Sequence, residues 1–182
     1  MTDTQPASVY DLAHTEQEES RATFAVLVDN EPGVLHRVVG LFAARGYNID
    51  SLTVAETDHN AHTSRITIVT RGTPQVLAQI EAQLQKMVST RHVQDVSKDP
   101  NGIERELALV KVRGTGAERV EALRVSDIFR AKVVDTTHES FVFELTGASS
   151  KIDKYVDLMR GLGLVEVSRT GVLSISRGVE VL

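Results

Sequence analysis

The sequence contains no cysteine among its 182 residues. That absence excludes disulfide bonds, zinc sites built on thiolates and a cysteine nucleophile, and it is typical of proteins kept in a reducing cytoplasm. No apolar run approaches the roughly 20 residues that a membrane-spanning helix needs, and the first residues lack the basic start and apolar centre of a secretory signal. We therefore expect a cytoplasmic protein with no membrane partner.

Acidic residues outnumber basic ones, 25 to 20, which gives a formal net charge of -5 at pH 7. A protein of this charge repels the phosphate backbone of nucleic acids, so we expect no nucleic-acid partner. Hydrophobic residues make up 41% of the chain. That fraction is sufficient for the core of one large domain or of two small ones.

Polar and turn-forming segments divide the chain. Residues 1–20 are polar and acidic, and they bury too little to become ordered, so we predict a flexible tail there. The turn-forming run Lys98–Gly102 lies within a predicted linker at residues 98–103. We expect one domain over residues 21–97 and a second over residues 104–182.

Hydrophobic periodicity in the first domain predicts the order strand, helix, strand, strand, helix, strand. The strands are expected at Phe24–Val28, Ile49–Ala55, Arg65–Thr70 and Thr90–Val96, with one helix between Leu35 and Gly46 and the other after Thr73 and Pro74. Threonine before proline is typical of a capped helix start. This order predicts a ferredoxin-like βαββαβ domain, in which two helices cover one face of a four-stranded antiparallel sheet.

The same order of elements is predicted again in the second domain. The strands are expected at Glu106–Val112, Lys132–Thr137, Phe141–Thr146 and Leu164–Arg169, and the helices at Ala117–Phe129 and Ser149–Leu162. The predicted fold class is therefore α+β with two ferredoxin-like domains. Because helices cover only one face of each sheet, the other face is left bare, and we expect at least a homodimer to cover it.

The segment that joins the first strand to the first helix carries the most chemistry. Gly33, Val34 and Leu35 fall at the helix amino terminus, where free main-chain N–H groups attract a carboxylate, and Asn30 offers an oxygen to an ammonium group. Such a site suits a free α-amino acid. The alternative reading is structural, because Asn30 could cap the helix and Gly33 could simply turn the chain.

Two neighbouring runs, Asp29–Phe42 and Arg45–Ala55, resemble the signature of acetolactate synthase (acetohydroxyacid synthase) small subunits. The resemblance continues through Ser64–Thr67, Glu104–Val112, Arg169–Leu173 and Ser176–Gly178. Many ACT domains share the Asn-x-Pro-Gly-Val-Leu turn, whereas the Arg-Gly-Tyr-Asn-Ile block and the motifs of the second domain narrow the resemblance to this family. The resemblance implies that residues 21–97 form an ACT domain.

The family resemblance implies regulation rather than catalysis, with no catalytic residue and no cofactor in this chain. It implies a large catalytic partner subunit that carries thiamine diphosphate, magnesium and FAD and joins two pyruvates, or pyruvate and 2-oxobutyrate. It also implies feedback inhibition by valine in branched-chain amino acid biosynthesis. The implied valine site lies across a homodimer of ACT domains and comprises Asn30, Gly33, Val34 and Leu35 of one protomer with Asn48 and Ile49 of its partner.

Other readings remain open. The chain could be a free-standing ACT-domain amino-acid sensor that regulates another enzyme, or a small enzyme that uses a histidine. His59 and His62 beside Asp58 have a spacing that could suggest a metal site, but a closed site needs about four ligands, so a solvated loop is favoured. We predict no metal site. The choice among valine, leucine and isoleucine is not determined, since a pocket separates such side chains by only about 1–3 kcal/mol.

Overall fold

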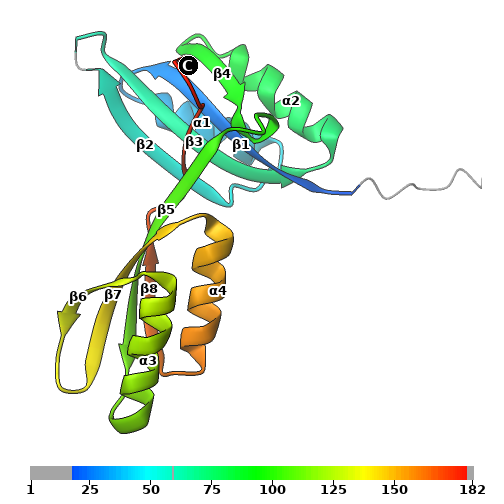
Figure 1. Cartoon of the computed structure of the whole chain (residues 1–182). Coiled ribbons are helices and arrows are strands. Elements are labelled where there is room, and N and C mark those ends of the chain that lie inside the picture. Colours follow the sequence, from blue (N-terminus) through cyan, green and yellow to red (C-terminus); the bar gives the residue numbers. More distant parts are fainter. Residues whose placement is uncertain (1–17, 59, 180–182) are drawn as a thin grey trace, which may run out of the picture.

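The computed structural model describes residues 18–58 and 60–179, so the predicted tail lies almost entirely outside the described residues. Two antiparallel sheets, each covered by a pair of helices, follow one another along the chain (Figure 1). The predicted α+β fold of two ferredoxin-like units is confirmed. The exact domain boundaries stay a prediction.

The first unit contains the elements β1 (Ser20–Asp29), α1 (Val34–Ala44), β2 (Ser51–Asp58), β3 (Thr63–Gly72), α2 (Pro74–Gln85) and β4 (Thr90–Asp95). Its strands lie in the order β2-β3-β1-β4. One face of β1 and β3 packs against the apolar sides of α1 and α2, and Phe24, Phe42 and Ile80 are fully buried there. Burial of these side chains is the main force that holds the unit together.

The second unit begins after a short 3-10 helix, η1 (Val96–Lys98), and contains β5 (Ile103–Arg113), α3 (Gly116–Phe129), β6 (Lys132–Thr136), β7 (Ser140–Gly147), α4 (Ser149–Arg160) and β8 (Leu164–Arg169). Its strands lie in the order β6-β7-β5-β8. A further strand that we did not predict, β9 (Leu173–Ile175), pairs with Ile103–Arg105 at the start of β5.

Local sequence signals set the helix ends of the first unit. The Thr73 hydroxyl accepts the N–H of Val76 at 3.4 Å, and Pro74 follows as the first helical residue, as predicted. Gly46 has φ +68° just after α1 ends, a conformation that glycine adopts at little cost. The chain therefore leaves α1 toward β2 through a glycine-dependent turn.

The C-terminal segment, which we define as Gly171–Ser176, returns from the second unit to the first (Figure 1). It lies on the face of the first sheet that α1 and α2 do not cover, where Thr67 and Ala25 pair with one another and are buried. The guanidinium Nη2 of Arg65, on the same face, donates to the Ser174 carbonyl at 2.8 Å. We expected this face to stay bare in a single chain, and that expectation was wrong because the chain's own C-terminal segment lies on it.

Tyr155 provides a pH-dependent test of the second core. The side chain is fully buried, and its hydroxyl lies 2.8 Å from Oγ of Ser126, which in turn donates to the Ala122 carbonyl at 2.7 Å. Burial raises the pKa of Tyr155 to about 12, and the Ser126 hydrogen bond opposes part of that rise. The neutral hydroxyl is therefore favoured in the folded state.

The free energy of unfolding should fall between about pH 10 and about pH 12. Below about pH 10 Tyr155 is neutral in both states, whereas above that value it ionises first in the unfolded chain. Urea denaturation should show that the wild type and Tyr155→Phe differ in their free energy of unfolding by a constant amount below about pH 10. Above that pH the difference should become smaller. The control Tyr47→Phe leaves the buried Tyr155 hydroxyl in place, so its free energy of unfolding should fall above about pH 10 as that of the wild type does. If the difference between the wild type and Tyr155→Phe did not change with pH, the account would be contradicted.

Candidate functional site

The turn between β1 and α1 places the first half of the predicted site. Gly33 is the cap residue of α1 and has φ +83°, and no side chain caps the helix. The alternative role of Asn30 as a helix cap is therefore excluded, while Gly33 does turn the chain. The main-chain N–H of Asn30 donates to the His62 carbonyl at 2.7 Å, which fixes the backbone and leaves the Asn30 side chain exposed.

The helix start presents main-chain donors to solvent, but not all of those we predicted. The N–H of Val34 donates to the Glu31 carbonyl at 3.2 Å, so that amide is already used. Within residues 18–58 and 60–179, the N–H groups of Gly33, Leu35 and His36 have no hydrogen-bond acceptor. Such unpaired donors at the positive end of a helix favour an anion.

Side-chain burial separates the roles of the two apolar residues in this half. Val34 is buried in the first core, so its side chain can offer a ligand little contact. Leu35 is 39% exposed, so its side chain can contact the apolar part of a ligand or a second protomer. Exposure of a large apolar side chain beside unpaired amides is consistent with an amino-acid site.

Arg37 is a charged neighbour that the sequence reasoning left out of the site. Its guanidinium forms an ion pair with Glu31, and Nη2 donates to the Ser89 hydroxyl at 3.3 Å. A Cβ atom on Gly33 would lie 3.8 Å from Nη1 of Arg37, so the cation lies close to the unpaired amides. Helical side chains point back toward the helix start, and the four-residue spacing from Gly33 was the signal that could have identified Arg37.

The second half of the predicted site follows the other end of α1. The side-chain amide of Asn48 donates to Asp50 at 2.7 Å, and the Asn48 carbonyl accepts the Thr70 hydroxyl at 2.6 Å. Asn48 is exposed, whereas Ile49 is half-buried against the first core. Asp50 also pairs with Arg71 at 2.9 Å, so Asn48 sits in an ordered polar network.

A single chain does not bring the two halves together. Gly33 precedes the first residue of α1 and Asn48 follows its last turn, and a helix of 11 residues is about 16 Å long at 1.5 Å per residue. A free amino acid cannot span that distance. Assembly of the predicted site therefore requires a second protomer, and that arrangement stays a prediction.

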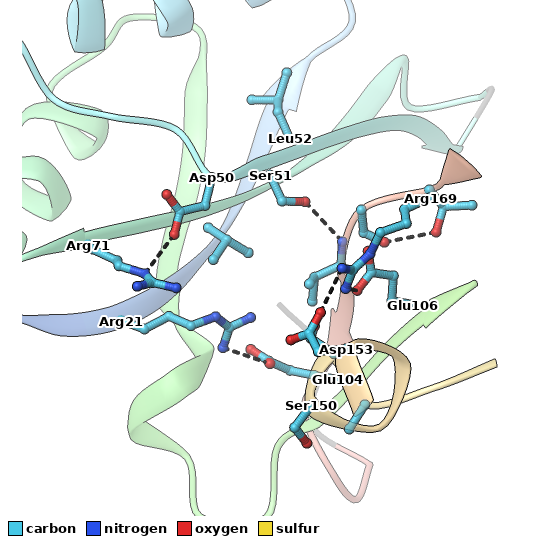
Figure 2. Close-up of a pocket in the computed structure, with 16 residues that line it drawn as sticks. Arg21, Asp50, Ser51, Leu52, Arg71, Glu104, Glu106, Ser150, Asp153 and Arg169 are labelled. Carbon is cyan, nitrogen blue, oxygen red and sulfur yellow. Dashed lines mark hydrogen bonds and ion pairs between the residues drawn. The ribbon is translucent and has the colours of Figure 1, made fainter. Parts of the chain in front are cut away.

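A polar cleft of about 860 Å³ lies between the two units, beside the second half of the site (Figure 2). Arg21 and Arg71 line one wall and Arg169 lines the other, and each is paired with a carboxylate. Arg21 joins the units directly through Glu104 at 3.0 Å. Since its arginines are already paired, the cleft is better described as a polar seam than as an anion site.

Arg169 pairs with two carboxylates in this seam. Its Nε and Nη2 donate to the two oxygens of Glu106 at 2.7 and 2.6 Å, and Nη1 donates to Asp153 at 2.7 Å. Hydrogen bonding to Glu106, together with Asp153, holds the pKa of Arg169 above its ordinary value, although partial burial opposes the shift. The planar fork fixes the end of β8 against β5.

Metal-binding groups and membrane-spanning helices are both absent from the described part of the chain. No group of three or more histidine, aspartate or glutamate side chains there could hold a metal ion, and His59 lies outside the described residues. None of the described helices combines the length and the apolarity needed to cross a bilayer.

Comparisons with known proteins cover both units. A family profile described as an AHAS small subunit-like ACT domain matches residues 24–92, and one described as the small subunit of acetolactate synthase matches residues 105–178. The probable acetolactate synthase small subunit of Archaeoglobus fulgidus is 44% identical over 156 residues, which cover 86% of this chain and 96% of the relative.

Two other relatives agree with these matches. The small subunit of acetolactate synthase isozyme 3 from Escherichia coli is 43% identical over 163 residues, covering 89% of this chain and 99% of that protein. The crystal structure of the acetolactate synthase small subunit from Thermotoga maritima superposes with a TM-score of 0.79 at 36% identity, covering 88% of this chain and 99% of that one. The chain therefore belongs to the family of acetolactate synthase small subunits.

Proposed function

We propose that this chain is the non-catalytic regulatory subunit of an acetolactate synthase, which binds the large catalytic subunit, raises its activity and confers feedback inhibition by valine. Family membership supports the regulatory role. The chemistry belongs to the large subunit, which joins two pyruvates or pyruvate and 2-oxobutyrate with thiamine diphosphate, magnesium and FAD. This chain needs no cofactor, and it acts in the cytoplasm with neither nucleic acid nor a membrane as partner.

One observation carries the effector half of the proposal. The unpaired N–H groups of Gly33 and Leu35 lie at the start of α1, next to the guanidinium of Arg37. Both features favour a carboxylate, and the exposed Asn30 side chain can accept hydrogen bonds from an ammonium group. A small apolar amino acid carries both charges and an alkyl group that suits the exposed Leu35 side chain.

The two-protomer arrangement explains how binding would regulate. In the proposal, Asn30, Gly33, Val34 and Leu35 of one ACT domain bind valine together with Asn48 and Ile49 of the other. The ACT domain occupies residues 21–97 and is joined to the second domain, residues 104–182, through residues 98–103. A ligand that bridges protomers favours one relative arrangement of them, and that difference in affinity is what shifts an equilibrium.

The test is reconstitution with the catalytic subunit. The large subunit should co-purify with this chain, its acetolactate-forming activity should rise on mixing, and valine should reverse the rise. This chain alone should turn over no pyruvate. A chain that binds valine but neither retains nor activates the large subunit would instead be a free-standing ACT-domain sensor of another enzyme.

Effector preference needs a separate titration. Calorimetry with valine, leucine and isoleucine should rank the three within about 1–3 kcal/mol of one another, because they differ by a methylene group or a branch point. Absence of heat with all three, with and without the large subunit, would contradict the sensing role.

A further inference from the structure

The C-terminal segment contacts β2 directly after the residues proposed to meet the effector. Asn48 donates to Asp50, and the next residue, Ser51, accepts the main-chain N–H of Val172 at 3.0 Å (Figure 2). Thr53, two residues further along β2, donates its hydroxyl to the Val172 carbonyl at 3.2 Å. Both main-chain polar groups of Val172 are therefore held by side chains of one strand.

The contact is closely packed. Val172 is 4% exposed, and Gly171 beside it has φ +83°. A Cβ atom on Gly171 would lie 2.5 Å from the Ser51 hydroxyl and 3.1 Å from the Thr53 methyl group, so only glycine fits without a shift. Because Ser51 and Thr53 lie directly against Gly171 and Val172, we expect a displacement of the start of β2 to be passed on to the segment.

The residues just before this segment are fixed to the second unit. The N–H of Thr170 donates to the Leu107 carbonyl at 3.0 Å, and the Leu107 N–H donates to the Thr170 hydroxyl at 3.1 Å. Arg169 is held by Glu106 and Asp153. Polar contacts, linked by short stretches of backbone, therefore lead from Asn48 through Ser51 and Val172 to Thr170 and Arg169. They join the first unit to the second.

We propose that the contact of Ser51 and Thr53 with Val172 couples effector binding at Asn48 to the second domain, so that valine changes how the two domains are held together. This inference rests on the proposed function and adds the route by which the same site regulates. Binding of the effector displaces Asn48 and Ile49 and, with them, the start of β2. The C-terminal segment then passes this displacement on to Thr170 and Arg169. Coupling of this kind requires contacts that respond to the ligand rather than contacts that are merely close.

The competing possibility is a static cover, in which the C-terminal segment only shields the open face of the first sheet. The double variant Ser51→Ala/Thr53→Val removes both contacts with Val172 and keeps side chains of similar size. Thr57→Val is the matched control, because Thr57 lies on the same strand and its hydroxyl donates to the Thr63 carbonyl at 3.5 Å rather than to the C-terminal segment. All proteins are assayed as holoenzyme with the large subunit.

Coupling predicts that the double variant binds valine within about threefold of the wild-type affinity but loses about half or more of the maximal inhibition. Activation without valine should be retained, and Thr57→Val should behave as the wild type. Full inhibition in the double variant would overturn the inference. A fall in affinity of about tenfold or more would also overturn it, since the contact would then belong to the binding site itself.

Hydrogen exchange of the wild-type chain tests the same inference without any variant. Valine should change the exchange of two peptides, one over residues 30–37 and one over residues 170–176, which contains the Val172 amide bonded to Ser51. A change at residues 30–37 alone would leave the proposed function standing and overturn the coupling. No change at either peptide would overturn the proposed function and the coupling with it.

Discussion

Replacing Gly33 with aspartate should raise the Kd of valine about 100-fold, equivalent to about 2.7 kcal/mol. The new carboxylate would occupy the space where the effector's own carboxylate meets the free amides of Gly33 and Leu35, and its Cβ would lie 3.8 Å from Nη1 of Arg37. The new carboxylate would repel the carboxylate of valine, and it would also compete with valine for the guanidinium of Arg37. Calorimetric titration measures the affinity, and an activity assay with the large subunit should show activation retained.

Gly33→Asn is the matched control for this substitution. Asparagine and aspartate have nearly the same shape, and both tolerate the positive φ of +83° better than other side chains do. The asparagine variant should therefore bind valine much more tightly than the aspartate variant. Equal losses in both would assign the effect to shape rather than to charge, and wild-type affinity in Gly33→Asp would place the effector carboxylate elsewhere.

Replacing Gly163 with alanine should destabilise the second domain by about 3 kcal/mol or more. Gly163 has φ +86°, and a Cβ atom there would lie 2.0 Å from the carbonyl oxygen of Arg113, which is a main-chain atom and cannot rotate away. The Gly163 carbonyl also accepts the Arg113 N–H at 2.8 Å, so relief of the clash would break the junction of β5 and β8. For a domain of this size the melting temperature should fall by roughly 15 °C.

The control for this change lies two residues away. Gly161 has φ -74°, and a Cβ atom on it would meet the Leu158 carbonyl at 3.6 Å, an ordinary van der Waals contact. Gly161→Ala should therefore change the free energy of unfolding by less than about 1 kcal/mol, with a gain expected from the stiffer unfolded chain. Differential scanning calorimetry compares the two variants, and similar melting temperatures would contradict the packing described for Gly163.

Regular elements could be predicted from the sequence because each depends on local periodicity. The apolar run Phe24–Val28 and the stripe through Leu77, Ile80 and Leu84 mark a buried strand and one face of a helix, and both occur as expected. The Thr73 cap depends on one side chain three residues from its partner. Such signals lie within a few residues of the structure they produce, so a single sequence is sufficient to read them.

The C-terminal segment could not be predicted in the same way. β9 has only three residues, and its pairing with Ile103–Arg105 joins parts of the chain about 70 residues apart. Leu173 and Ile175 are each 58% exposed, so they carry no clear pattern of burial. The contacts of Val172 with Ser51 and Thr53 involve its main chain, which has no signature in the sequence.

The candidate site was predicted in part. The positive φ of Gly33 and the unpaired amide of Leu35 agree with the chemistry expected of the turn, but the Val34 amide is used within the turn by Glu31. That hydrogen bond depends on the loop conformation, which residue type alone does not determine. Arg37 was missed because its role comes from the direction in which the side chain folds back over Gly33.

The most direct measurement is a crystal structure of the chain grown with valine. The account predicts density for one amino acid at each ACT interface, its carboxylate within hydrogen-bond distance of the Gly33 and Leu35 amides of one protomer and its ammonium group near Asn30. The side chains of Asn48 and Ile49 from the second protomer should complete the pocket. Valine bound within a single protomer, or a dimer whose α1 helix starts are remote from Asn48, would contradict the account.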